Sequence, residues 1–113
     1  MNDLETLLNL DGERFRIENG YWVKFEVKKI ETSNESPHGL RYSVTLHDSR
    51  NRRILGYDNI HPYKPLKGGR FGARKTAWDH VHKRDMTWPY EFETAAGLLE
   101  DFWRDVEKLM EEK

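Results

Sequence analysis

Two stretches in which every second residue is apolar constrain the fold of this 113-residue chain most strongly. In the first, Tyr21, Val23, Phe25 and Val27 alternate with Trp22, Lys24, Glu26 and Lys28. In the second, Leu40, Tyr42, Val44 and Leu46 alternate with Arg41, Ser43, Thr45 and His47. Because successive side chains of a strand point to opposite faces, a period of two is typical of a half-buried strand. The sequence therefore predicts a sheet with one apolar face.

Turn residues separate these strands from their neighbours. Asn19-Gly20 indicates a two-residue hairpin, and Asp48–Asn51 indicates a turn that places His47 near the start of the returning strand. Pro89 cannot donate to a strand ladder, so the strand that contains it is expected at an edge. We expect strands at 15–18, 21–32, 40–47, 52–57 and 87–93.

The C-terminal segment Thr94–Glu112 is predicted to be an amphipathic helix. One side carries Leu98, Leu99, Phe102, Trp103, Val106, Leu109 and Met110; Glu100, Asp101, Asp105 and Glu112 are expected on the other. A second, short helix or turn is indicated by leucines between Leu4 and Leu10. The predicted fold class is α+β: one domain over residues 1–113, with an antiparallel sheet of about five strands and the C-terminal helix packed on one face.

The composition indicates a soluble domain, with 36% hydrophobic and 35% charged residues and no cysteine. Because no apolar run is long enough to cross a bilayer and no targeting segment is evident, we expect a cytoplasmic protein without membrane contact. The net charge of −1 conceals an uneven distribution, since residues 41–88 carry eleven basic and four acidic side chains. A local cationic surface can attract phosphate despite a neutral total.

Two short blocks place histidine beside aspartate: Tyr57–His61 and Trp78–His82. On a strand, His80 and His82 would share one face; on a helix they would diverge, and the sequence leaves both open. Two convergent imidazoles can cleave RNA without metal, one taking the proton of the 2′-hydroxyl and the other protonating the leaving oxygen. The catalytic candidates are His61, His80 and His82, with Asp58 and Asp79 to orient them. The same groups could instead ligate a divalent ion, although their spacing matches no zinc motif.

A basic, glycine-containing stretch lies between these blocks. It lacks the Gly-Lys-Ser/Thr sequence of a Walker A loop, so ATP binding is disfavoured. Cations and close backbone amides can instead hold the phosphates of RNA, and aromatic rings can stack on unpaired bases. The candidates for RNA or phosphate binding are Lys64, Lys67, Arg70, Arg74, Lys75, Tyr63 and Phe71.

Ordered motifs along nearly the whole chain carry a family resemblance. They are Glu5–Leu8, Asp11-Gly12, Asn19–Trp22, Pro37–Gly39, Arg41–Ser43, Leu46–Asp48, Arg52–His61, Trp78–His82, Tyr90–Phe92 and Leu98–Trp103. In this order they resemble the TumE family of small bacterial and archaeal proteins, which are regarded as toxins of type II toxin–antitoxin pairs. The resemblance implies a cytoplasmic toxin with a helix-turn-helix antitoxin as partner, and it assigns no catalytic residue.

Together these features predict a toxin that inhibits translation by metal-independent RNA cleavage, with no cofactor. Two alternatives stay open: a non-catalytic module that binds nucleic acid or the ribosome through the same basic surface, and an interaction domain whose acidic C-terminal segment binds a basic partner. The sequence does not indicate the oligomeric state.

Overall fold

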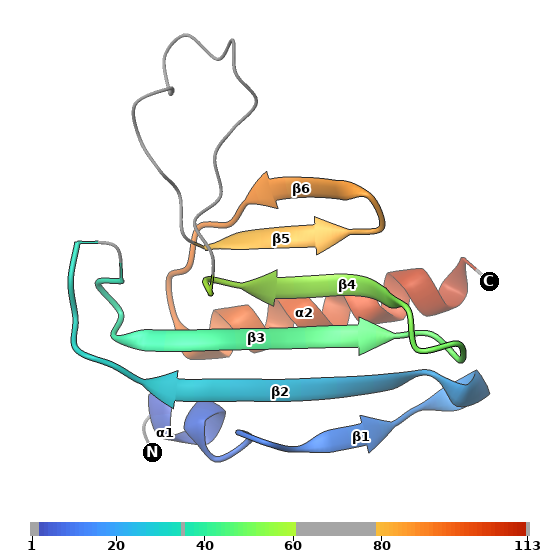
Figure 1. Ribbon diagram of the computed structural model, residues 1–113, viewed down its shortest axis with the longest axis horizontal. Coiled ribbons are helices and arrows are strands. Elements are labelled where there is room, and N and C mark those ends of the chain that lie inside the picture. Colours follow the sequence, from blue (N-terminus) through green and yellow to red (C-terminus); the bar gives the residue numbers. More distant parts are fainter. Residues whose placement is uncertain (1–2, 35, 61–78, 113) are drawn as a thin grey trace, which may run out of the picture.

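The computed structural model describes residues 3–34, 36–60 and 79–112, which form one antiparallel sheet and two helices (Figure 1). The elements in chain order are α1 (Asp3–Leu8), β1 (Arg14–Arg16), η1 (Glu18–Gly20), β2 (Trp22–Lys29), β3 (Leu40–His47), β4 (Arg53–Asp58), β5 (His80–Lys83), β6 (Met86–Pro89) and α2 (Ala95–Glu111). The six strands lie side by side in sequence order. Every neighbouring pair is antiparallel. The predicted α+β class is therefore confirmed, with one strand more than expected.

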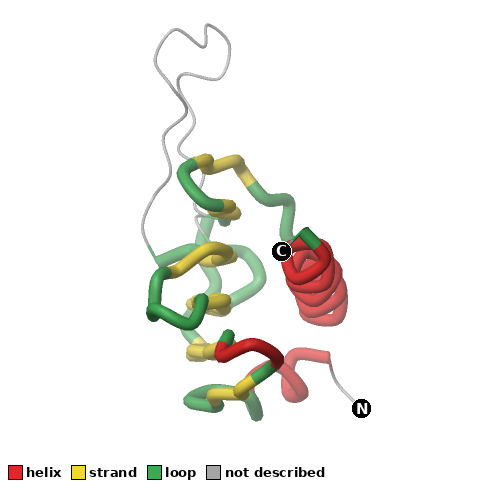
Figure 2. Tube along the Cα trace, turned by 90° about the vertical axis from the view of Figure 1, so that its right-hand side faces the viewer, coloured by secondary structure: helices red, strands yellow, loops and turns green. Residues whose placement is uncertain are grey.

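Both helices lie on the same side of the sheet (Figure 2). Helix α2 runs across the sheet, and α1 packs against α2 and β2. The core lies between the sheet and the helices. It is built from the apolar side chains on the helix-facing side of the strands, including Phe25, Tyr42 and Tyr57, together with Phe102 of α2. The face of the sheet that turns away from the helices is called the distal face below.

The hairpin expected at Asn19-Gly20 is confirmed. Asn19 and Gly20 have φ values of 62° and 80°, the left-handed conformation that joins two twisted strands tightly. A Cβ added at Gly20 would lie 3.0 Å from the Cβ of Ser49, so the neighbouring turn also favours glycine here.

The sixth strand is β5, whose conformation the sequence left open. Its residues pair with β4 on one side and β6 on the other. Strand β6 lies at the edge, as Pro89 predicts, but it is shorter than the expected 87–93. Tyr90 and Phe92 follow the strand and still pack against the core, whereas Trp88 is exposed.

Helix α2 begins where the sequence predicts. The side chain of Thr94 caps it by accepting a hydrogen bond from the backbone N–H of Gly97 at 2.9 Å. The prediction that Asp105 lies on the polar side of α2 is wrong, because this residue is 5% exposed. Asp105 lies one helical turn beyond Phe102, so it faces the sheet, where it accepts a hydrogen bond from the Tyr57 hydroxyl and lies 3.4 Å from Nζ of Lys83.

Candidate functional site

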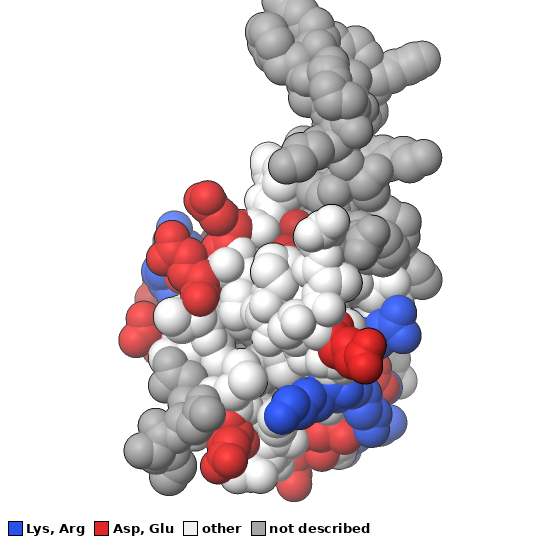
Figure 3. Space-filling view, turned by 90° about the vertical axis from the view of Figure 1, so that its left-hand side faces the viewer, with Lys and Arg blue, Asp and Glu red and all other residues white. Residues whose placement is uncertain are grey.

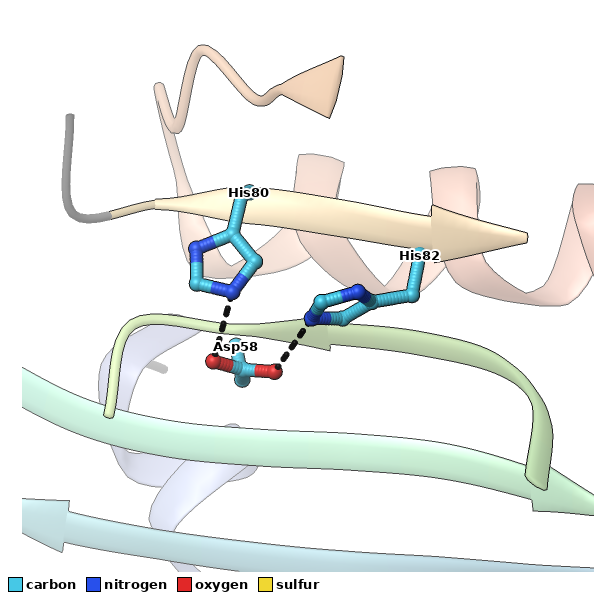
Figure 4. Close-up of side chains that lie close together, drawn as sticks. All are labelled: Asp58, His80 and His82. Atoms are coloured by element: carbon cyan, nitrogen blue, oxygen red, sulfur yellow. Dashed lines mark ion pairs between the residues drawn. The ribbon is translucent and has the colours of Figure 1, made fainter. Parts of the chain in front are cut away.

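Strand alternation places residues of both histidine–aspartate blocks on the same face of the sheet. Tyr57 and Val81 point into the core, so Asp58, His80 and His82 point to the distal face. Figure 4 shows these three side chains directed toward one another from β4 and β5, with α2 behind the sheet. The register of β4 against β5 explains why these side chains are close together, because Asp58 lies directly opposite His80.

The carboxylate of Asp58 lies between the two imidazoles. Its Oδ1 is 3.1 Å from Nε2 of His80, and its Oδ2 is 3.4 Å from Nε2 of His82 (Figure 4). The backbone N–H of Ile60 also donates to Oδ1 at 3.2 Å, and Nδ1 of His82 lies 3.0 Å from the Thr87 hydroxyl. These contacts fix the orientation of both the carboxylate and the His82 ring.

The three side chains differ in their access to solvent. Asp58 is 6% exposed and His80 is 3% exposed, whereas the His82 side chain retains about a fifth of its surface, 20%. The two imidazole rings meet edge to face, with centroids 4.6 Å apart. His82 is therefore the member of the cluster that a ligand can reach most directly.

A glycine makes room for this arrangement. His82 lies opposite Gly56, which has no side chain, so the ring can lean diagonally toward Asp58. A Cβ at Gly56 would lie 3.3 Å from Cδ of Arg53, which shows that the Arg53 side chain passes over this position. The guanidinium of Arg53 thereby comes near His82.

Burial and neighbouring charges set the protonation of the cluster. Burial would raise the pKa of Asp58, but the hydrogen bond from His80 and the charges of the two histidines outweigh it and lower the pKa. Burial and then Arg53 lower the pKa of His82, against the opposing effect of Asp58. Near neutral pH, Asp58 is thus a carboxylate and His82 a neutral imidazole, which is able to accept a proton.

Asp79 does not join this cluster, although the sequence analysis paired it with the same histidines. It lies on the helix-facing side, where its Oδ2 accepts hydrogen bonds from the Tyr42 hydroxyl at 2.8 Å and from Nε2 of His38 at 2.9 Å. The backbone N–H of Leu40 donates to Nδ1 of His38, which places the imidazole proton on Nε2. Sequence reasoning did not select His38, because it precedes Asp79 by 41 positions and lies in the loop between β2 and β3.

Eight of the sequence-predicted residues lie outside the described residues. They are His61, Tyr63, Lys64, Lys67, Arg70, Phe71, Arg74 and Lys75. Their roles in proton transfer and RNA binding stay predictions.

A second group on the distal face combines cations with aromatic rings. Trp22 stacks on His47 with ring centroids 4.0 Å apart, and the Arg14 guanidinium lies 5.5 Å from the Trp22 ring centroid. Burial and then the charges of Lys24, Arg53 and Arg14 lower the pKa of His47, so three cations surround this ring. Sequence reasoning missed this group, although the alternation of Trp22 and Lys24 on the polar side of β2 indicates it. Arg53 connects it to the histidine cluster.

One end of the molecule carries side chains of both charges. Figure 3 views the end at which β2 leads into β3, and there Lys and Arg side chains lie beside Asp and Glu around uncharged side chains. Mixed charge of this kind provides no extended attraction for phosphate. The cationic group around His47 lies toward the opposite end of β2 and β3, where Trp22 pairs with His47.

The histidine cluster also has the composition of a metal site. The possible donor atoms of Asp58, His80 and His82 all lie within 4.8 Å of one another. Asp79 and His38 form a separate pair on the other face. In the described part of the chain, neither helix is long and apolar enough to cross a membrane.

The fold and this cluster define a small α+β protein with an imidazole–carboxylate centre on one face of its sheet. Residues 7–110 match the family model described as toxin TumE, so the chain belongs to this family. Membership identifies it as the toxin of a toxin–antitoxin pair, with an antitoxin as its partner. No curated protein and no solved structure matches the chain.

Proposed function

We propose that this toxin inhibits translation by cleaving RNA, with Asp58, His80 and His82 as the catalytic groups and no metal ion in the reaction. The observation that carries this proposal is the single carboxylate of Asp58, which holds two imidazoles on the distal face. We further propose that the whole chain, residues 1–113, acts as one cytoplasmic toxin domain, neutralised by a cognate helix-turn-helix antitoxin.

The proposed chemistry assigns proton transfers to the histidines. His82, neutral and partly exposed, takes the proton of a ribose 2′-hydroxyl, whose oxygen then attacks the adjacent phosphorus. A second imidazole, His80 or the predicted His61, returns a proton to the departing 5′-oxygen. Asp58 orients the rings, and Arg53 stabilises the negative charge that develops on the phosphate.

The cationic group around His47 supports RNA as the substrate. Arg14, Lys24 and Arg53 supply attraction to phosphate that does not depend on base sequence. Trp22 supplies an aromatic surface of the kind on which unpaired bases stack. Because Arg53 lies near both His47 and His82, an RNA strand held by this group would pass beside the histidine cluster.

Inducible expression with parallel measurement of growth and RNA integrity tests the proposal. Wild type should arrest growth and fragment RNA, whereas His82→Ala and Asp58→Asn should do neither, and His61→Ala tests the predicted second proton-transfer residue. Asp79→Asn is the matched control, because it changes the equivalent aspartate of the other block on the opposite face. Growth arrest with intact RNA would refute the cleavage mechanism and leave toxicity standing.

One observation favours the second candidate, a non-catalytic module that binds RNA or the ribosome. His80 is almost fully buried, and Nε2 of each histidine faces Asp58, as in a purely structural network. Under this alternative, Arg14→Ala and Lys24→Ala should each reduce the slope of log affinity against log salt by about 1, while histidine variants stay nearly silent. Arg104→Ala, a cation on α2 paired with Asp101, is the control.

A further inference from the structure

We propose that Asp58, His80 and His82 form a binding site for one divalent transition-metal ion of the Zn²⁺ or Co²⁺ type. Two imidazole nitrogens and one carboxylate oxygen are ligands that such ions accept readily. Mg²⁺ and Ca²⁺ favour sets of oxygen ligands, so this cluster should discriminate against them.

The distances fit such an ion. With metal–ligand bonds of about 2.0–2.2 Å, neighbouring ligands of a tetrahedral Zn²⁺ lie about 3.3–3.6 Å apart. Oδ1 of Asp58 lies 3.1 Å from Nε2 of His80, and Oδ2 lies 3.4 Å from Nε2 of His82. One donor atom from each of the three residues lies within 4.8 Å of the other two. Rotation of these side chains could therefore bring the three donor atoms to ligand spacing, with little change to the strand backbone.

The hydrogen bonds around the cluster also suit a metal ligand. A ligating histidine normally donates its second ring N–H to a neighbouring acceptor, which fixes the tautomer. The Thr87 hydroxyl, 3.0 Å from Nδ1 of His82, can serve in both states, because it can donate a hydrogen bond or accept one. Without an ion, the tautomer that carries its proton on Nε2, beside the Asp58 carboxylate, lets Thr87 donate to Nδ1. With an ion at Nε2, the imidazole proton would move to Nδ1 and be donated to Thr87. The backbone N–H of Ile60 holds Oδ1 of Asp58 in place in either state.

The consequence for activity rests on the proposed function. A bound ion would occupy Nε2 of both histidines, and the proton on Nδ1 of His82 would leave that ring unable to accept another. Zn²⁺ should therefore inhibit metal-independent cleavage, and a chelator should restore it.

Metal titration of the chelator-treated, full-length chain tests the site. Calorimetry with Zn²⁺ should show one ion per chain, and Co²⁺ should give visible absorption typical of nitrogen and oxygen ligands in low coordination. Thr87→Ala should weaken binding about tenfold or more, the usual effect of losing a partner of a ligand, and Thr87→Ser should restore it. His82→Ala should abolish specific binding, whereas Asp79→Asn should bind as wild type does.

The outcomes separate the metal site from the proposed function. A wild type that retains no ion, or equal binding by wild type and His82→Ala, would overturn the metal site. Confirmed binding with inhibition agrees with both proposals. Confirmed binding with stimulation of RNA cleavage would keep the site and overturn only the metal-independent mechanism.

Discussion

Removal of the Asp79 carboxylate should destabilise the fold and leave the site chemistry intact. Asp79 accepts two hydrogen bonds, from the buried Tyr42 hydroxyl and from His38. Hydrogen bonds to a charged acceptor contribute about 1.5–3 kcal/mol each. Because the Asp79 side chain is partly reached by solvent, we take the lower value for each bond and expect Asp79→Ala to cost about 3 kcal/mol. At about 2.1 cal/mol/K of unfolding entropy per residue, that loss lowers the Tm of a chain of this length by about 13 °C.

Asp79→Asn removes the charge of this side chain and keeps its shape, so it measures the contribution of the charge to stability. The amide oxygen can still accept one bond, so the cost should fall to about 1 kcal/mol. Urea unfolding of wild type, Asp79→Ala, Tyr42→Phe and the double variant forms a cycle that removes this bond from either side, and these contacting residues should show a coupling energy of at least about 0.5 kcal/mol. Additive effects would show that the Tyr42–Asp79 bond contributes nothing to stability.

Activity provides the sharper comparison. Asp79→Asn should fragment RNA at wild-type levels at a temperature where it stays folded, whereas Asp58→Asn should be inactive. The reverse result, an inactive Asp79→Asn with a wild-type circular dichroism spectrum and an active Asp58→Asn, would refute the assignment of the site to the distal face.

Three further predictions concern stability. Phe102→Ala, which empties a fully buried position against Phe25, should cost about 3–5 kcal/mol in urea unfolding, against less than about 1 kcal/mol for the exposed Phe15→Ala. Thr94→Ala should cost about 1 kcal/mol because the cap of α2 is lost, and Thr94→Ser should recover most of it. Hydrogen bonds from the backbone N–H groups of Arg52 and Arg50 lower the pKa of Asp48. Its contribution to stability is therefore present above the ordinary aspartate pKa and is lost as the pH falls through the lowered pKa of the folded state. The stability difference between wild type and Asp48→Asn, measured by thermal unfolding, should therefore be full at pH 7 and shrink as the pH falls below about 4.

Much of the fold follows from periodicity in the sequence. The alternation in β2 and β3 determines their buried face, and the spacing of Leu98, Phe102 and Val106 determines the buried side of α2. Strand β5 could not be predicted in this way, because His80–Lys83 contains a single strongly apolar residue and histidine occurs on either face. The burial of Asp105 was also hidden, since only the folded chain shows that Tyr57 and Lys83 lie opposite it.

The sequence predicts the residues of the candidate site, but it does not predict which aspartate lies beside the histidines. Asp58, His80 and His82 were each selected from the sequence, but local spacing treats Asp58 and Asp79 as equivalent. What separates them is the register of β4 against β5, a long-range property that places Asp58 opposite His80. The cationic group around His47 is non-local for the same reason, because β1, β2, β3 and β4 each contribute a residue to it.

The apolar core determines which groups meet on the distal face. A slip of β5 by one residue would turn His80 and His82 toward α2 and expose Val81, because side chains alternate along a strand. Val81 is paired with Tyr57 on one side and Trp88 on the other, and its burial in the core opposes that slip. The position of the histidines beside Asp58 is therefore maintained by a valine on the opposite face of the same strand. Val81→Asp should disturb the site through the register, with loss of metal binding and of activity together, whereas Val81→Ile, which keeps the apolar anchor, should preserve both.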